Sequence, residues 1–199
     1  MGVVKLSTAG IRNYSKATDF LVGNVPFSPI PPSAFDLLET TTLSTSASSV
    51  TFSGLGAYSD YKHLQIRMIG RSDASVSQAS GFLDFNGDTV STNYKSHFLE
   101  GRGNTVLSAA TAPIYFVAVN GASETAGDFS VAVTEILDFS NVYKNTTTRT
   151  LSGKASSLAN RIDLMSGLWM NTNAVTSIRA YLSSGNWIAG SRFSLIGIR

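Results

Sequence analysis

Apolar and polar residues alternate along most of this chain from residue 35 onward. The segment that begins at Leu64 shows the pattern clearly, because its apolar residues stand two positions apart with polar residues between them. A period of two is typical of a strand with one face in a core and one in water. Three segments share it and predict core faces made of Leu64, Ile66 and Met68; Phe129, Val131 and Val133; and Ile162, Leu164, Leu168 and Met170.

Turn-forming residues divide this pattern into short segments. Residues 125–139 fit either a helix or a strand, and the β-branched Val131, Val133 and Thr134 favour a strand. Ten or so antiparallel strands favour an all-β, two-sheet sandwich of jelly-roll type over an immunoglobulin-type sandwich. We expect strands near residues 35–42, 48–53, 62–71, 81–86, 94–99, 113–119, 128–138, 146–156, 161–170, 175–183 and 187–198.

The last of these strands ends the chain, with its final apolar residue, Ile198, one position from the C-terminus. The backbone N–H and C=O groups of such a strand need hydrogen-bond partners on strands formed earlier. We therefore expect residues 187–198 to lie between strands from much earlier in the chain and to close the sandwich.

Residues 1–34 have no strand or helix period. Four of the five prolines fall between Pro26 and Pro32, where they favour an extended path that does not join the interior of a sheet. The segment is either a disordered tail or first turn on its own core, or an arm that docks onto another protein, which we favour. The predicted domains are an anchoring arm, 1–34, and a sandwich, 35–199. The predicted arm anchors are Leu6, Ile11, Tyr14, Phe20, Leu21 and Phe27.

Composition limits the classes of binding partner and the kinds of site that we expect for this chain. Charged residues make up 14% of the chain, against a usual share of about 25%, while Ser and Thr supply roughly a quarter of it. The net charge is +2 and the cations are scattered, so we expect no nucleic-acid partner. Cysteine is absent, which excludes disulfides and cysteine-based sites. We expect no secretory signal, because residues 1–10 have one cation and no apolar h-region. We expect no membrane partner, because no apolar run approaches the roughly 20 residues of a span.

Residues 84–88 have the D-x-N-x-D opening of a calcium loop. The twelfth position of such a loop would be Lys95 instead of a bidentate Glu, and Gly87 falls at the fourth position instead of the sixth. We interpret Asn86 and Gly87 instead as the tip of a hairpin, a turn that needs positive φ.

Other candidate chemistry is sparse. His63 and His97 lie in predicted strands without a second ligand at metal-binding spacing. Glycoside hydrolysis needs two carboxyl groups across a cleft, yet Glu135 and Asp138 fall on opposite faces of one predicted strand. We predict no catalytic residue, no metal, no cofactor and no enzymatic activity. The sequence does not pair the remaining candidate acids, which are Glu39, Glu100 and Asp163.

Trp169 and Trp187 both lie in predicted strands beside apolar neighbours. Exposed aromatic side chains form carbohydrate-binding platforms, whereas buried ones fill the core of a sandwich. The flanking Leu168 and Met170 favour core or subunit-interface packing, with glycan binding as the alternative.

The order of several short blocks resembles a family of small virion proteins of tailed bacteriophages, especially marine and cyanobacterial phages. The blocks are spread over most of residues 35–198. They are FDLLETTTL at 35–43 and SSVTFS at 48–53; YKHLQIR at 61–67; FNGD at 85–88 with NY at 93–94; GLW at 167–169 with VTSI at 175–178; and GSRFSLIGI at 190–198.

The resemblance implies a non-enzymatic virion protein on the particle exterior, assembled in the host cytoplasm. Its arm would bind other virion structural proteins, and the sandwich would project and associate with copies of itself as a homotrimer. Capsid decoration or cement and a short tail fibre or adaptor both fit. The alternative is a carbohydrate-binding module that adsorbs to a host surface glycan.

Overall fold

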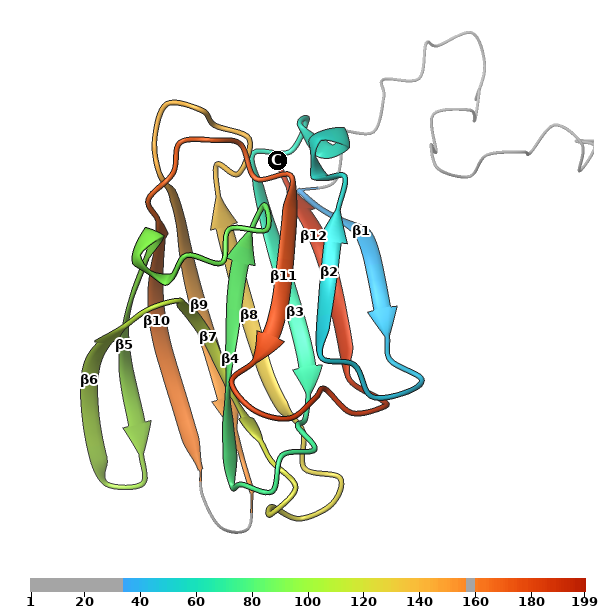
Figure 1. Cartoon of the computed structure of the whole chain (residues 1–199), viewed down its shortest axis with the longest axis vertical. Helices are drawn as coiled ribbons and strands as arrows, with labels where there is room; N and C mark the ends of the chain where they lie inside the picture. The colour runs from blue at the N-terminus through green and yellow to red at the C-terminus, as the bar shows by residue number, and fades with distance from the viewer. Residues whose placement is uncertain (1–33, 157–159) are drawn as a thin grey trace, which may run out of the picture. The chain divides into compact units, whose positions relative to one another are not determined.

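The computed structural model describes residues 34–156 and 160–199, and they fold into strands with two short 3₁₀ turns (Figure 1). The all-β prediction is confirmed. The described residues form β1 (Phe35–Thr42), β2 (Ser49–Ser53), β3 (His63–Gly70), β4 (Gln78–Phe85), β5 (Tyr94–Arg102), β6 (Thr105–Thr111), β7 (Ile114–Asn120), β8 (Ser130–Leu137), β9 (Thr146–Lys154), β10 (Arg161–Trp169), β11 (Ser177–Leu182) and β12 (Arg192–Ile198).

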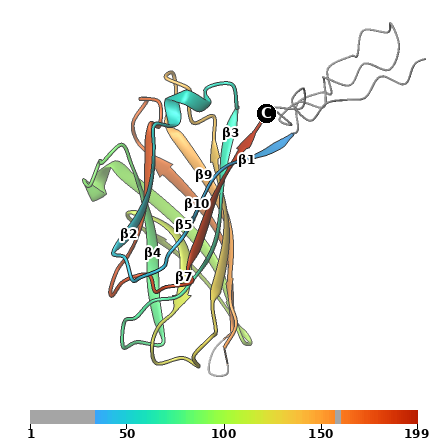
Figure 2. The same cartoon turned by 90° about the vertical axis from the view of Figure 1, so that its right-hand side faces the viewer.

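The strands form two antiparallel sheets that pack face to face as a sandwich (Figure 2). The large sheet has the order β1-β12-β3-β8-β9-β10-β5-β6, and the small sheet has the order β2-β11-β4-β7. The last strand, β12, lies between β1 and β3, so the predicted closure of the sandwich by the end of the chain is confirmed.

Four strand pairs organise the fold: β1 with β12, β2 with β11, β3 with β8, and β4 with β7. These pairs alternate between the large and the small sheet. Two further hairpins, β5–β6 and β9–β10, lengthen the large sheet beyond β8. The large sheet is therefore wider than the small sheet that faces it.

The space between the sheets holds the main core. Trp169 and Trp187 lie in it, and the ring of Trp187 meets that of Phe193 edge-on at 5.0 Å. A smaller cluster fills the space beside β7, where Tyr115 and Met165 pack with Phe98 from β5. The β5–β6 hairpin and β10 are thus held to the small sheet through the edge strand β7.

Two details differ from the predictions. β6 was not predicted, because Thr105–Thr111 has weak alternation and is mostly exposed. Asn86 and Gly87 do have positive φ, 54° and 70°, as a tight turn requires. However, β4 and β5 belong to different sheets, so this turn carries the chain across the sandwich and the predicted hairpin is wrong.

Candidate interaction surface

The face of the large sheet that points away from the small sheet, here called the outer face, is built by the strand register. Directly paired residues on neighbouring strands point to the same side of a sheet. Six strands, β3, β8, β9, β10, β5 and β6, contribute to two adjacent rows on this face. The first row is Arg67, Val133, Leu151, Leu164, Leu99 and Ser108, and the second is Ile69, Val131, Gly153, Ile162, Gly101 and Val106.

Aliphatic side chains dominate both rows, and they are exposed. Their exposed fractions run from 38% at Ile69 to 73% at Val106. Monomeric proteins seldom expose large contiguous apolar patches, and a patch of this kind marks an interaction site. We call these residues the aliphatic face: Ile69, Leu99, Val106, Val131, Val133, Leu151, Ile162 and Leu164.

A polar row borders the aliphatic face on one side. Glu135 and Arg149 form an ion pair of 2.7 Å there, and His97 lies on the same row two strands away. On the β3 side, Arg67 donates a hydrogen bond of 2.8 Å to Gln65. An apolar centre with a hydrogen-bonded polar edge is the usual anatomy of a protein–protein interface.

The aliphatic face points outward because β8 and β10 direct into the core the side chains opposite to those that the sequence pattern predicts. Leu64, Ile66 and Met68 of β3 are buried, as predicted. In the other two segments the predicted core face is wrong: Val131 and Val133 point outward, and so do Ile162 and Leu164. Three further residues of those segments are partly or largely accessible: Phe129, Leu168 and Met170.

The inner face of the same strands carries buried polar groups. Arg161 forms ion pairs with Asp163 at 2.7 Å and with Glu100 at 2.9 Å, and it donates a hydrogen bond of 2.8 Å to the Tyr115 hydroxyl. Burial raises the pKa of the Asp163 carboxyl, and the charge of Arg161 opposes that shift. Lys154 and Glu124 form a second buried pair at 3.3 Å.

The structure brings together two of the acids that the sequence could not pair. Asp163 and Glu100 are direct neighbours on β10 and β5, and Arg161 bonds both. Both carboxyl groups are buried and held by a cation instead of facing a cleft. The arrangement is that of a structural ion cluster. The prediction that Glu135 and Asp138 share one strand is wrong, because Asp138 lies beyond the end of β8, where it is bonded to Lys144.

The remaining predicted sites take structural positions. Asp84 bonds Arg179, and Asn86 accepts hydrogen bonds from the Thr176 and Ser177 amides. Asp88 accepts hydrogen bonds from the Trp169 indole and the Asn93 amide, and these bonds lower the pKa of Asp88. The three side chains of the calcium-like motif are thus engaged in three different places. Among the described residues, no cluster of three or more His, Asp or Glu is arranged to hold a metal ion.

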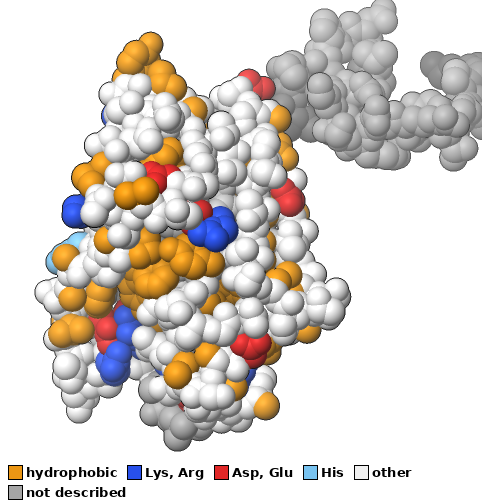
Figure 3. Space-filling view, in the orientation of Figure 1, with side chains coloured by type: hydrophobic (Ala, Val, Ile, Leu, Met, Phe, Trp, Pro, Cys, Tyr) orange, Lys and Arg blue, Asp and Glu red, His pale blue; other side chains and the backbone are white. Residues whose placement is uncertain are grey.

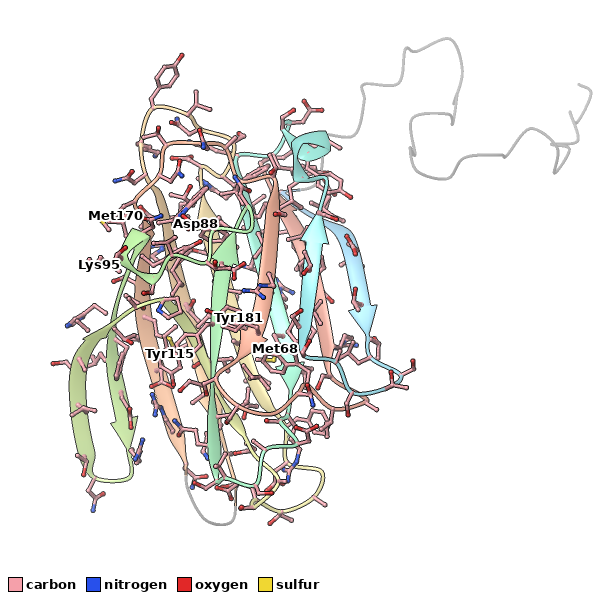
Figure 4. The ribbon with its side chains drawn as sticks, in the orientation of Figure 1. Met68, Asp88, Lys95, Tyr115, Met170 and Tyr181 are labelled. Atoms are coloured by element: carbon pink, nitrogen blue, oxygen red, sulfur yellow. The ribbon has the colours of Figure 1, made fainter. Side chains whose placement is uncertain are left out.

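The two histidines also have local roles. His63 Nδ1 accepts a hydrogen bond of 2.8 Å from the Asp138 amide, whereas His97 lies on the polar row of the outer face. Lys95, the twelfth residue of the calcium-like motif, is exposed at the start of β5, near Met170 in Figure 4.

Trp169 and Trp187 are both buried, at 1% and 0% exposure. Their indole N–H groups donate to Asp88 and to the Ala180 carbonyl. The favoured prediction of core packing is therefore confirmed for both tryptophans, and the alternative of a glycan platform formed by them is wrong. The predicted arm anchors, by contrast, all lie outside the described residues: Leu6, Ile11, Tyr14, Phe20, Leu21 and Phe27.

A second surface with partly exposed aromatic rings lies on the small sheet. Phe82 and Tyr181 are 5.8 Å apart, and the guanidinium of Arg179 stacks 4.6 Å from the Tyr181 ring. Figure 3 shows hydrophobic side chains gathered in the middle of this side, where Figure 4 places Tyr115 and Tyr181. The sequence singled out the tryptophans and missed this group.

No protein-family model matches the chain, and neither a curated protein nor a solved structure gives a significant match. The phage-family resemblance therefore stays a prediction. Within the described part of the chain, no helix has the length and apolarity needed to cross a membrane.

Proposed function

We propose that this chain is a non-enzymatic structural protein of a bacteriophage particle, in which the sandwich is a projecting domain and residues 1–34 hold it to another virion protein. The observation that carries the proposal is the aliphatic face, because exposed side chains of this kind favour contact with protein. The proline-rich anchoring segment and the block resemblance support the phage assignment.

The sandwich is proposed to be a jelly roll extended by four strands. A jelly roll is a two-sheet sandwich built from two Greek keys with eight strands. The four pairs β1/β12, β2/β11, β3/β8 and β4/β7 follow one another as if a single long hairpin were rolled up. The extra hairpins, β5–β6 and β9–β10, then account for the greater width of the large sheet.

The particle exterior suits the low charge and the many hydroxyl groups. Capsid decoration or cement and a short tail fibre or adaptor remain the two proposed locations. In either place the apolar and aromatic anchors of the arm would give affinity, and the prolines would limit the entropy lost when the arm is ordered.

Deletion of residues 1–33 tests the arm. We expect incorporation of the truncated protein into particles to fall by more than about tenfold, the effect of losing some 1.4 kcal/mol of binding. Occupancy is measured by quantitative mass spectrometry of purified particles, and thermal unfolding shows whether the truncated sandwich still folds. As a matched control, Ser7, Ser15 and Ser28 are changed to Ala. Full occupancy of a folded truncated protein would overturn the arm.

Carbohydrate binding is the second candidate, and the Phe82–Tyr181 pair is the observation that favours it. Partly exposed rings stack on the apolar face of sugar rings, and a nearby arginine supplies donors. Tyr181→Ala should then abolish binding on an array of host-surface glycans, while Tyr143→Ala, which alters an exposed loop tyrosine, should not. Binding unchanged by Tyr181→Ala would exclude this surface.

A further inference from the structure

We infer that the aliphatic face pairs with the same face of a second copy of this chain, about a twofold axis that runs parallel to the strands between β9 and β10. The inference rests on the size of the face, on the positions of its glycines and on the distribution of its charges. It does not depend on the virion role, because it concerns the purified protein alone.

The size of the outer face fits a dimer interface. About the proposed axis the six strands from β3 to β6 overlap with those of the second copy; about 4.8 Å apart and each about 25 Å long, they give a face on the order of 700 Å². A stable specific interface buries about 800 Å² on each partner. The aliphatic face extends across this area from β3 to β6, and the polar row borders it.

Glycines give the second row a relief of knobs and gaps. Ile162 is paired with Gly153 on one side and with Gly101 on the other. Beyond these two gaps stand Val131, next to Gly153, and Val106, next to Gly101. The row therefore presents side chains separated by two glycine positions, of which Gly153 is the more open, because the Ile162 side chain leans toward Gly101, where an added Cβ would meet its Cγ2 at 3.3 Å.

The twofold axis places side chains of one copy's second row over the glycine positions in the second row of the other copy. Rotation about an axis between β9 and β10 places β9 over β10 of the second copy, and β8 over β5. Ile162 then lies over the second copy's Gly153, and Val131 lies over its Gly101. Each gap receives a side chain from the other copy, as close packing of an interface requires. A partner of unrelated shape would have no reason to match these spacings, which is why we assign a second copy.

Arg149 on β9 lies beside this axis, so the two copies' Arg149 side chains come close together, and the ion pair that each makes with Glu135 at 2.7 Å offsets their like charges. The other polar groups agree with the same axis. Glu135 on β8 comes opposite His97 on β5 of the second copy, where an imidazole N–H can donate to the carboxylate. The cation Arg67 lies on β3, and the axis places the two copies' Arg67 side chains about 24 Å apart across the face. That separation exceeds the Debye length of about 8 Å, so their repulsion is screened.

A dimer of this kind differs from the trimer predicted from the sequence. A twofold interface joins one surface to itself, whereas a ring of three needs two different surfaces on each subunit. Sedimentation equilibrium of the full chain distinguishes the two by mass, and we expect a dimer. A monomer at high protein concentration, or a trimer, would overturn the inference.

The variant Gly153→Val tests whether a side chain of the second copy packs into the gap at Gly153. A Cβ at this position would meet only the Arg161 carbonyl oxygen, at an ordinary 3.6 Å, and β-branched residues suit strands, so the variant should fold. Because the gap is filled, the dissociation constant of the dimer should rise at least about thirtyfold, the effect of losing a hot spot of 2 kcal/mol. Ile162→Arg should do the same. Tyr143→Arg, at an exposed loop residue outside the aliphatic face, is the control.

Cross-linking fixes the axis, because the chain has no cysteine of its own. In the proposed dimer Val133 faces Leu99 of the second copy, whereas within one chain these residues are three strands, or about 14 Å, apart. The double variant Val133→Cys with Leu99→Cys should give covalent dimers with a short bis-maleimide that spans packed sheets about 10 Å apart. Either single variant should not. Equal yields from the single and double variants, or no dimer from the double variant, would overturn the proposed axis.

Discussion

The two faces of β10 differ in both burial and polarity, although their residues alternate along one strand. On the inner face, Arg161 and Asp163 are charged and buried, and Met165 packs beside Tyr115. On the outer face, Ile162 and Leu164 are aliphatic and more than half exposed. The neighbouring β9 shows the same inversion, with buried Thr, Ser and Lys side chains inside and Leu151 outside.

This inversion separates the residues that fold the domain from those that we propose to associate it. Buried polar groups are tolerated when hydrogen bonds and ion pairs satisfy them, as they are around Arg161. Aliphatic groups that stay about half exposed gain little from folding the single chain, so their clustering needs another explanation. The inner face therefore sets stability, and the outer face is free to set association.

The comparison is tested most strongly by Arg161→Met. The change leaves the Asp163 and Glu100 carboxyl groups buried without their shared cation, which should lower the free energy of unfolding by about 3–5 kcal/mol. Since burial already raises the pKa of Asp163, the folded variant should bind protons more readily than the unfolded chain. Its stability should then rise as the pH is lowered from mildly alkaline to mildly acidic. Urea unfolding at one mildly alkaline and one mildly acidic pH measures both the loss of stability and its dependence on pH.

Arg102→Met is the matched control for this change. Arg102 contacts the same Glu100 carboxyl group at 2.7 Å, but its side chain is 54% exposed. An exposed ion pair contributes at most about 1 kcal/mol. If both arginine variants lost the same stability, burial would not be what distinguishes the inner face.

Adjacent residues on β10 give a second test. Met165 is 5% exposed and Leu164 is 56% exposed. Met165→Ala should cost about 2–5 kcal/mol because it empties space in the cluster beside β7. Leu164→Ala should cost less than about 1 kcal/mol, since much of its side chain is already in water. Thermal unfolding is measured at a protein concentration low enough to keep both variants monomeric, and similar losses would contradict the assignment of the two faces.

Most of the fold followed from the sequence. Alternation and turn residues located eleven of the strands, and the position of β12 between β1 and β3 followed from the need to pair the end of the chain. β6 escaped prediction because Thr105–Thr111 packs against little and lacks a clear apolar face. Sheet membership was also beyond the pattern: a turn at Asn86 and Gly87 serves a hairpin and a crossover equally well.

The candidate surface could not be predicted, since both faces of β10 carry apolar residues. Met165 and Trp169 share one face, and Ile162 and Leu164 share the other. The face with Ile162 and Leu164 has more apolar positions, so the pattern predicts it as the core face. In the structure the opposite face is buried, because it carries the ion cluster. The ion cluster cannot be recognised from the sequence of β10 alone, because its other members, Glu100 and Tyr115, come from β5 and β7. A strand that is apolar on both faces is nonetheless a usable signal that both faces become covered.

The smallest effects concern a hydroxyl pair on the inner face. Thr150 donates a hydrogen bond of 2.9 Å to Thr134, and both residues are buried. Thr150→Val should cost about 1–3 kcal/mol because it leaves the Thr134 hydroxyl without this partner. Changing both residues to Val should cost less than the single change, since the two methyl groups then meet where the hydroxyls did. Urea unfolding of both single variants and the double variant completes a double-mutant cycle. If the two losses simply added, the hydroxyls would not act as a pair, and the inner face of β9 would owe its polarity to something other than mutual hydrogen bonding.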